Sequence, residues 1–220
     1  MSFFWYVSRS KLELLTEQYD KSVLDSFRGL ALKFKTPVAE AELRFTNAGP
    51  GLVSEVRRVE KRIVQDTAPL DFECLSTEEA QLPPFFLFDT PAARLVEERG
   101  FWVAGHVGGA ALVLVGAARH ATGAFSSPSA LSPSVDPLRA ITEKAEGDSA
   151  RVGADLGGAS SYAWQAIMRT NGQNKIPLPT VRGIAVTVAV VEAQRQQIRR
   201  AGIPGIQRLV IGTPLHIEQT

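Results

Sequence analysis

The amino-acid sequence predicts a single α+β domain over residues 1–220, with helices packed on a mixed, mostly antiparallel sheet. Short runs rich in β-branched and aromatic residues occur near both ends of the chain and in its middle, at residues 3–7, 101–115 and 184–190. Between the first two runs lies an amphipathic pattern of helical spacing at residues 52–63. Strands at both ends of a chain, with helices inserted unevenly between them, are typical of this fold class.

The composition is that of an ordinary globular protein in a reducing compartment. Hydrophobic residues make up 45% of the chain and charged residues 21%, and the formal net charge is +1. This balance provides no strong field for a nucleic acid. Cys74 is the single cysteine, which excludes an intramolecular disulfide, and no apolar run approaches the roughly 20 residues of a membrane-spanning helix. We therefore expect a cytoplasmic protein that acts without a membrane or a nucleic acid.

The first part of the chain is predicted to form strands and two helices. Residues 3–7 form the first strand, and Ser8 caps the helix that follows. Alternation in residues 30–35 and 43–46 predicts a hairpin with one exposed face. After Gly49-Pro50-Gly51, a stripe of apolar residues at helical spacing predicts the clearest helix of the chain. Its members are Leu52, Val56, Val59 and Ile63.

The middle of the chain mixes strand and helix signals. Residues 72–75 and 85–88 are expected to be strands. Thr90 followed by Pro91 is typical of a helix start, so a short helix is expected from there to Gly100. Two further helices are expected, one at residues 136–145 and one that starts at Ser160 or Ser161 and stops at Asn171-Gly172.

Two β-rich runs at residues 101–107 and 110–115 surround the dipeptide Gly108-Gly109. Glycine supplies the positive φ angles that tight hairpin turns require. The sequence therefore predicts an antiparallel hairpin here.

The C-terminal region is predicted to form a strand, a helix and a second strand. Ile184, Val186, Val188 and Val190 alternate, so they should share a buried face. The small residues Ala185 and Ala189 on the other face leave room for a helix, which is predicted at residues 193–201. Residues 208–212 return as a strand, and Thr213-Pro214 is expected to break or bulge it before residues 215–218.

Two segments that follow predicted strands carry the residue types that hold anions. Ser8 and Lys11 lie at a predicted helix start, where backbone N–H groups and a lysine attract negative charge. Gly116, Arg119 and His120 follow a strand through small residues, which allow backbone amides to approach a ligand. We predict that these five residues line one pocket, on condition that the two strands are parallel neighbours whose ends open on the same side.

Other candidate residues are given structural interpretations. The three histidines, His106, His120 and His216, lack the spacing of a metal site, so no metal is predicted. His106 and His216 are interpreted as strand histidines that face solvent or bond to a backbone carbonyl. Cys74 is interpreted as a small buried hydrophobe, and Arg57 as part of a solvated basic helix face.

Three short segments resemble a family of uncharacterised actinobacterial proteins. They are Tyr6-Val7-Ser8-Arg9-Ser10-Lys11-Leu12, the run from Val113 to Gly123 with its glycine turn and histidine, and Val210-Ile211-Gly212-Thr213-Pro214-Leu215. The chain departs from that pattern at Ala117, where a glycine or serine is expected. The resemblance implies one coherent domain and no particular reaction or cofactor.

Three functions remain open from the sequence. The leading hypothesis is a protein that binds or senses an anionic small molecule, a nucleotide being one option, through Ser8, Lys11, Gly116, Arg119 and His120. The second is a hydrolase or nucleotide-processing enzyme with His120 as acid or base and Asp89 as its nearest acid. The third is an assembly or partner-binding protein, a homo-oligomer included, with the last strand as its exposed edge.

Overall fold

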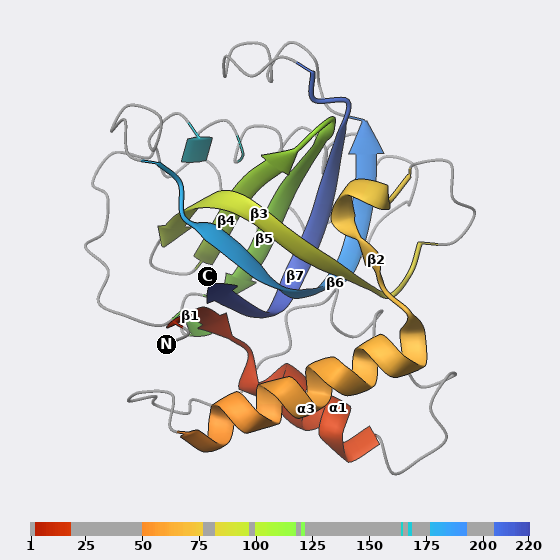
Figure 1. Cartoon of the computed structure of the whole chain (residues 1–220), viewed down its shortest axis with the longest axis vertical. Coiled ribbons are helices and arrows are strands. Elements are labelled where there is room, and N and C mark those ends of the chain that lie inside the picture. The colour runs from red at the N-terminus through yellow and green to blue at the C-terminus, as the bar shows by residue number, and fades with distance from the viewer. Residues whose placement is uncertain are drawn as a thin grey trace.

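The computed structural model describes residues 3–18, 50–76, 82–96, 100–117, 120–121, 164, 167–168, 177–192 and 205–220. Within these ranges the chain is mostly β. Five strands close into a mixed β-barrel, and two helices lie together against one side of it (Figure 1). The helices and strands, in chain order, are β1 (Phe3–Val7), α1 (Arg9–Gln18), α3 (Pro50–Thr67), β2 (Leu70–Asp71), the 3₁₀ helix η1 (Phe72–Cys74), β3 (Phe85–Val96), β4 (Gly100–Val107), β5 (Ala110–Ala117), β6 (Thr180–Glu192) and β7 (Arg208–Gln219).

The barrel closes because β3 and β7 each pair with more than one strand. β3 pairs with β6 through its first half and with β4 through its second half. β4 pairs with β5, β5 with β7, and β7 with β6, which completes the circle. The β5–β7 pair is parallel and the other barrel pairs are antiparallel. The predicted mixed, mostly antiparallel sheet is thus present, but it is a closed barrel, and the fold is mostly β.

Two predictions for the middle of the chain are wrong. The segment from Pro91 to Val96 is part of β3 and not a helix. Pro91 lies where β3 changes partner from β6 to β4, so the missing N–H of proline removes little from either ladder. Residues 72–74 form a 3₁₀ helix where a strand was expected, and Cys74 is exposed.

The central hairpin is confirmed. β4 and β5 pair in register from Gly100 with Ala117 to Val107 with Ala110. Gly108 has a φ of 53° in the turn between them, a backbone angle that glycine adopts without steric cost. The double glycine therefore closes the hairpin as the sequence indicates.

The barrel interior is filled by aromatic side chains that lie over glycines. A Cβ atom added to Gly116 would lie 2.6 Å from the ring of Tyr6. The same construction on Gly212 reaches Phe86 at 2.6 Å, and on Gly183 it reaches Phe88 at 2.7 Å. Small barrels alternate large and small residues to fill their taper. Further buried members of this interior cluster include Trp5, Phe72, Phe101, Leu112 and Ile217.

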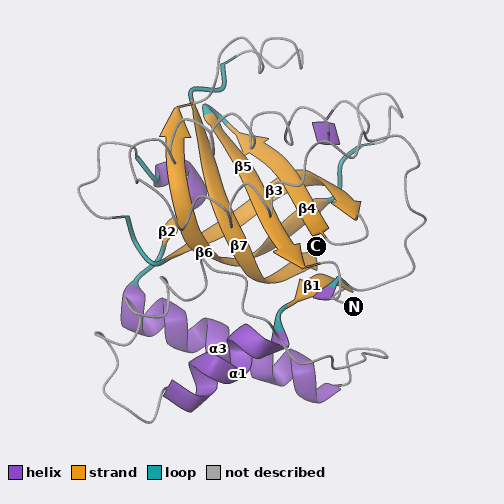
Figure 2. Ribbon diagram, turned by 180° about the vertical axis from the view of Figure 1, so that it is seen from behind, coloured by secondary structure: helices purple, strands orange, loops and turns teal. Residues whose placement is uncertain are grey.

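A second core lies between the outer face of the barrel and the two helices. Figure 2 shows α1 and α3 packed beside each other against the same side of the barrel. The stripe predicted at residues 52–63 is confirmed, since its four apolar residues are buried there together with Leu12 and Leu15 of α1. β1, β3, β6 and β7 contribute Phe4, Val7, Phe85, Ile184, Val186 and Leu215.

A third core covers another part of the outer face. The indole Nε1 of Trp164 donates a hydrogen bond of 3.0 Å to the carbonyl of Gly105. Trp164, Ile167 and Met168 have helical backbone, in agreement with the helix predicted there, and they pack on the outward side chains of β4 and β5.

The predicted faces of β6 are only half right. Ile184 and Val186 are buried against the helix layer, but Ala185 faces the barrel interior and leaves room for aromatic rings there. A β-bulge between Thr187 and Ala189 then changes the alternation, so Val188 and Val190 are only partly buried. The bulge expected near Thr213-Pro214 in β7 is present, because Leu215 is the extra residue opposite Ile184 and Ala185.

Several predictions lie outside the described residues. These are the hairpin at residues 30–46 and the helices at 136–145 and 193–201. Among the described helices, none is both long enough and apolar enough to cross a membrane.

Candidate functional site

The C-terminal ends of β1 and β5 meet on one edge of β7. β6 occupies the opposite edge of β7 along its length. On the shared edge, β5 pairs in parallel with residues 208–212 and β1 pairs in antiparallel fashion with residues 216–219. β1 and β5 therefore run toward each other and end beside residues 213–215. We call this meeting point, with Ser8, Lys11, Gly116 and His120 around it, the β1–β5 junction.

The condition set for a shared pocket is wrong in its topology. The two strands are not parallel neighbours, because they run in opposite directions along the same edge. Their C-terminal ends nevertheless come together, since both strands end beside residues 213–215 of β7. This arrangement brings Ser8 and Gly116 to the same region even though more than a hundred residues separate them.

Lys11 spans the gap that the two strands leave in the ladder of β7. Its Nζ donates to Thr213 Oγ1 at 2.5 Å and to the carbonyl of Pro214 at 3.2 Å. The backbone N–H of Ser8 donates to the carbonyl of Leu215 at 2.8 Å. The ammonium group thus lies at the junction and replaces hydrogen bonds that a continuous strand would provide.

Ser8 links β1 to the first turn of α1. Its carbonyl accepts the Leu12 N–H at 3.1 Å, so Ser8 occupies the predicted cap position, but its hydroxyl makes no capping hydrogen bond in the described structure. Its side chain is only 1% exposed, and within the described structure Ser8 Oγ has no hydrogen-bond partner. Strand alternation places Ser8 on the same side of β1 as Tyr6. A buried hydroxyl at a helix N-terminus is a group that a ligand oxygen can satisfy.

Tyr6 connects Gly116 to His120. The Tyr6 ring lies over Gly116, stacks on Phe101 at a centroid distance of 5.1 Å, and meets the ring of His120 edge-on at 5.7 Å. A single antiparallel bridge between Tyr6 and Ala121 fixes this segment beside β1. His120 is buried. Arg119, the remaining predicted site residue, lies outside the described residues.

The enzyme hypothesis finds no support in the placement of Asp89. Asp89 is exposed on the outer face of β3, in register with Arg182 of β6, whereas His120 packs against Tyr6, whose ring belongs to the interior cluster. In the described part of the chain, no three potential ligand side chains gather into a metal site.

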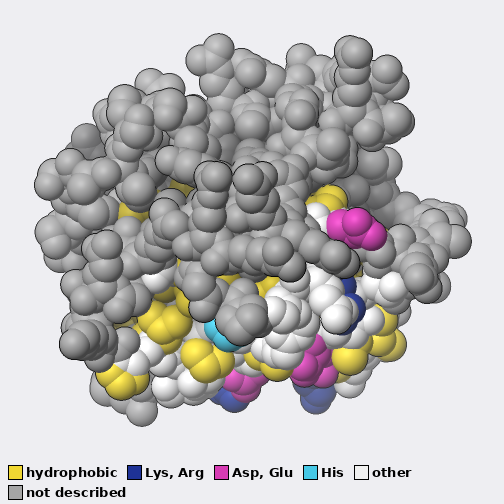
Figure 3. Space-filling view, turned by 90° about the horizontal axis from the view of Figure 1, so that it is seen from above, with side chains coloured by type: hydrophobic (Ala, Val, Ile, Leu, Met, Phe, Trp, Pro, Cys, Tyr) yellow, Lys and Arg dark blue, Asp and Glu magenta, His cyan; other side chains and the backbone are white. Residues whose placement is uncertain are grey.

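The assembly hypothesis is corrected in one respect. β7 is paired on both edges, with β6 on one and with β5 and β1 on the other, so it offers no exposed edge. On the face shown in Figure 3, acidic and basic side chains of the described residues lie beside one another.

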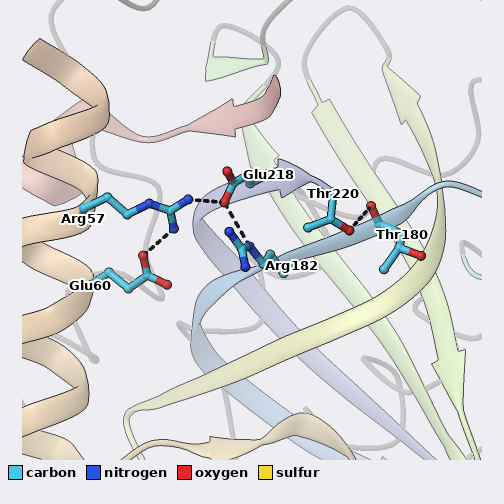
Figure 4. A network of polar contacts seen from close by, with 6 residues as sticks. All are labelled: Arg57, Glu60, Thr180, Arg182, Glu218 and Thr220. Atoms are coloured by element: carbon cyan, nitrogen blue, oxygen red, sulfur yellow. Dashed lines mark hydrogen bonds and ion pairs between the residues drawn. The ribbon is translucent and has the colours of Figure 1, made fainter. Parts of the chain in front are cut away.

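The sequence did not reveal an ionic cluster that joins α3 to the barrel around one buried carboxylate. Glu218 of β7 is 1% exposed, and its Oε2 accepts from Arg57 Nη2 at 2.5 Å and from Arg182 Nε at 3.1 Å (Figure 4). Arg57 Nη1 also pairs with Glu60 at 2.8 Å, and the pKa of Arg57 is raised mainly by this hydrogen bond. Arg57 was interpreted as part of a solvated helix face; it is partly exposed, but it also joins α3 to the barrel through Glu218.

The two strand histidines differ from their interpretation as solvent-facing or carbonyl-bonded. His216 is 2% exposed, and Nε2 has no hydrogen-bond partner within the described structure. Burial lowers its pKa to about 4. His106 is half-buried against Trp164, with ring centroids 6.2 Å apart, and desolvation lowers its pKa as well. A polar residue at every second position of an otherwise apolar strand, His216 and then Glu218, was the signal available in the sequence.

Comparison with known proteins places the whole chain in one family. No curated protein and no solved structure matches it. A family profile matches residues 2–220, nearly the whole chain. The chain therefore belongs to a family of unknown function, DUF7019.

Proposed function

We propose that this protein binds an anionic small molecule at the β1–β5 junction. The observation that carries the proposal is the buried hydroxyl of Ser8, which has no hydrogen-bond partner within the described structure and lies at the N-terminus of α1. A helix N-terminus attracts anions because its first N–H groups point outward and its dipole is positive there. Lys11, in the first turn of the same helix, adds a cation.

The three segments on which the resemblance to other proteins rests support the same location. They contain the end of β1 with the start of α1, the end of β5 with His120, and the middle of β7. Lys11 bonds to Thr213 and Pro214, and Gly116 lies under Tyr6, so each segment contacts another. We propose that these segments form the ligand site of the family, with Arg119 as a second cation beside His120. A phosphate ester, including a nucleoside monophosphate, has the charge and the acceptor oxygens for this set of donors.

A titration with inorganic phosphate and with AMP tests the proposal. Isothermal calorimetry on the wild-type protein should show binding that weakens as the salt concentration rises. Ser8→Ala should raise the dissociation constant about tenfold, since a hydrogen bond to a charged ligand contributes roughly 1.5 kcal/mol. Arg119→Ala should raise it further.

Lys61→Met and Thr187→Val are the matched controls. Lys61 is an exposed cation on α3, and Thr187 carries a second buried hydroxyl without a hydrogen-bond partner in the described structure. Neither change should alter binding. If no anion binds, or if Thr187→Val weakens binding as much as Ser8→Ala, the junction is not the site.

A further inference from the structure

His216 lies in the wall between the barrel and the helix layer. On β7 it is in register with Val7 of β1 and with Ile184 of β6, and both are members of the core beneath α1 and α3. The ring of Phe4 meets its imidazole edge-on, with centroids 6.0 Å apart. Apolar groups therefore surround an imidazole whose Nε2 has no hydrogen-bond partner in the described structure.

Four charged side chains act on His216 from the elements packed around it. Arg57 and Glu60 come from α3, Arg182 from β6, and Glu218 from β7 itself. These groups are already paired with one another through Glu218 and Glu60 (Figure 4). β1 contributes only Phe4 and Val7 to this core, and α1 contributes Leu12 and Leu15. A proton on the buried imidazole of His216 would thus add an unpaired charge beside a cluster whose charges are already balanced, which is costly.

The interior of the barrel is formed without α3. The interior cluster of the barrel contains no residue of α3. The apolar core of its stripe and the ion pair between Arg57 and Glu218 join α3 to the barrel. The ion pair ends on Glu218, and His216 is in register with two members of that core, so hydration of this surface requires that α3 moves away.

We propose that His216 is an acid-sensitive latch: a proton taken up from solvent at its imidazole opens α3 away from the barrel while the barrel stays folded. The pKa values of the buried and the hydrated imidazole support opening in acid rather than in base. His216 titrates at about 4 when it is buried, against the ordinary 6.5 when it is hydrated. The open state therefore takes up the proton more readily, and acid shifts the equilibrium toward it. The inference is independent of ligand binding at the junction.

Hydrogen–deuterium exchange followed by mass spectrometry tests the latch. Protection factors, corrected for the intrinsic pH dependence of exchange, are measured at pH 7.5 and at pH 4.5 for α3 and for β4–β5. The opening constant of α3 should rise on the order of 50-fold between these pH values. The hairpin should keep a higher opening free energy than α3 at both pH values, because acid favours every state that hydrates His216 but only α3 opens without global unfolding. If α3 and the hairpin have equal opening free energies at pH 4.5, or if the opening of α3 does not respond to pH, the latch is refuted.

Substitutions of His216, which is buried, and of His106, which is half-buried, test whether His216 is the group that opens α3 in acid. His216→Leu keeps the volume and removes the titration, so α3 should remain protected at pH 4.5. His216→Met, which adapts to irregular space, serves the same purpose if the leucine variant does not fold. His106→Leu is the control on the opposite core and should leave the acid opening of α3 in place. An α3 that still opens in the His216 variants would assign the effect to another group and overturn the proposal.

Discussion

The ring of Tyr6 lies directly over the backbone of Gly116. A Cβ atom at position 116 would approach the Cε2, Cζ and hydroxyl oxygen of Tyr6 to 2.6 Å, closer than real side chains approach. Tyr6 is also held from other directions by Phe101 and His120. The ring thus has no free direction in which to move, and the absence of a side chain at Gly116 is a packing requirement.

Gly116→Ala should therefore destabilise the protein. Overpacking of a filled core costs about 1–3 kcal/mol, and we expect a loss of that size in the free energy of unfolding measured by urea denaturation. Gly51→Ala is the control, because a Cβ atom there meets nothing within 4 Å on α3. Equal stabilities of the Gly116 variant and the wild type would contradict the packing argument.

Arg57 should contribute more to stability than its neighbour Arg58. Arg57→Met removes one of the two guanidinium groups that hold the buried carboxylate of Glu218. We expect a loss of about 1–2 kcal/mol, reduced from the value of a fully buried pair because Arg57 is partly exposed to water. Arg58→Met on the exposed face should change the free energy of unfolding by less than roughly 0.5 kcal/mol. Equal effects of the two substitutions in chemical denaturation would show that the ion pair is without consequence.

The stability of the whole protein should depend on His216 between pH 6.5 and pH 4. The pKa of His216 is about 4 in the folded protein, below its ordinary 6.5. The unfolded chain therefore binds the proton first as the pH falls. The contribution of His216 is complete above pH 6.5 and decreases to a loss of about 3 kcal/mol near pH 4. Urea denaturation across this range should show a shallower pH dependence for His216→Leu than for the wild type, and equal slopes would contradict the assignment.

Ala68 offers a site for stabilisation. It follows the last residue of α3 and has a φ of 42°, in the left-handed region. A Cβ atom is unfavourable there, whereas glycine is the preferred residue just after a helix. Ala68→Gly should raise the free energy of unfolding by about 0.5–1 kcal/mol. Gln65→Gly, inside the same helix, should lower it by a similar amount. A loss of stability in Ala68→Gly would contradict the argument that the left-handed backbone at Ala68 is strained.

The elements that the sequence predicted well are those whose signal is local. The stripe of α3 and the double glycine of the β4–β5 hairpin each depend on residues within one element. The closure of the barrel depends on β3, which changes partner at Pro91. Proline after Thr90 is a typical helix start, and its tolerance inside this strand follows from a distant pairing that no local pattern reveals.

In the candidate site too, residues with a local signal were predicted and residues brought together by long-range packing were not. Ser8, Lys11, Gly116 and His120 were found because each carries its chemistry beside a predicted strand end. The cluster of Glu218, Arg57 and Arg182 was missed, since it draws one residue from each of three elements. Local pattern placed Arg57 on a helix with charged neighbours, and only the packing of that helix on β7 shows that it is an ion-pair partner.

The stability of the ligand-free protein gives a separate test of the role of Ser8. Ser8 Oγ and Thr187 Oγ1 are both buried, and in the described structure neither has a hydrogen-bond partner. A buried hydroxyl without a partner costs about 1–3 kcal/mol. Ser8→Ala and Thr187→Val should therefore leave the free energy of unfolding unchanged or raise it by up to roughly 1 kcal/mol.

The two variants should then differ when phosphate is added. Bound ligand stabilises the folded protein according to its concentration and affinity. The melting temperature of Thr187→Val should rise with phosphate as in the wild type, whereas that of Ser8→Ala should rise less, because the donor at the helix N-terminus is missing. A Ser8→Ala protein that is less stable without ligand would show that the hydroxyl is a structural group. The burial of the Ser8 hydroxyl would then be explained by the structure of the protein alone, without a bound anion.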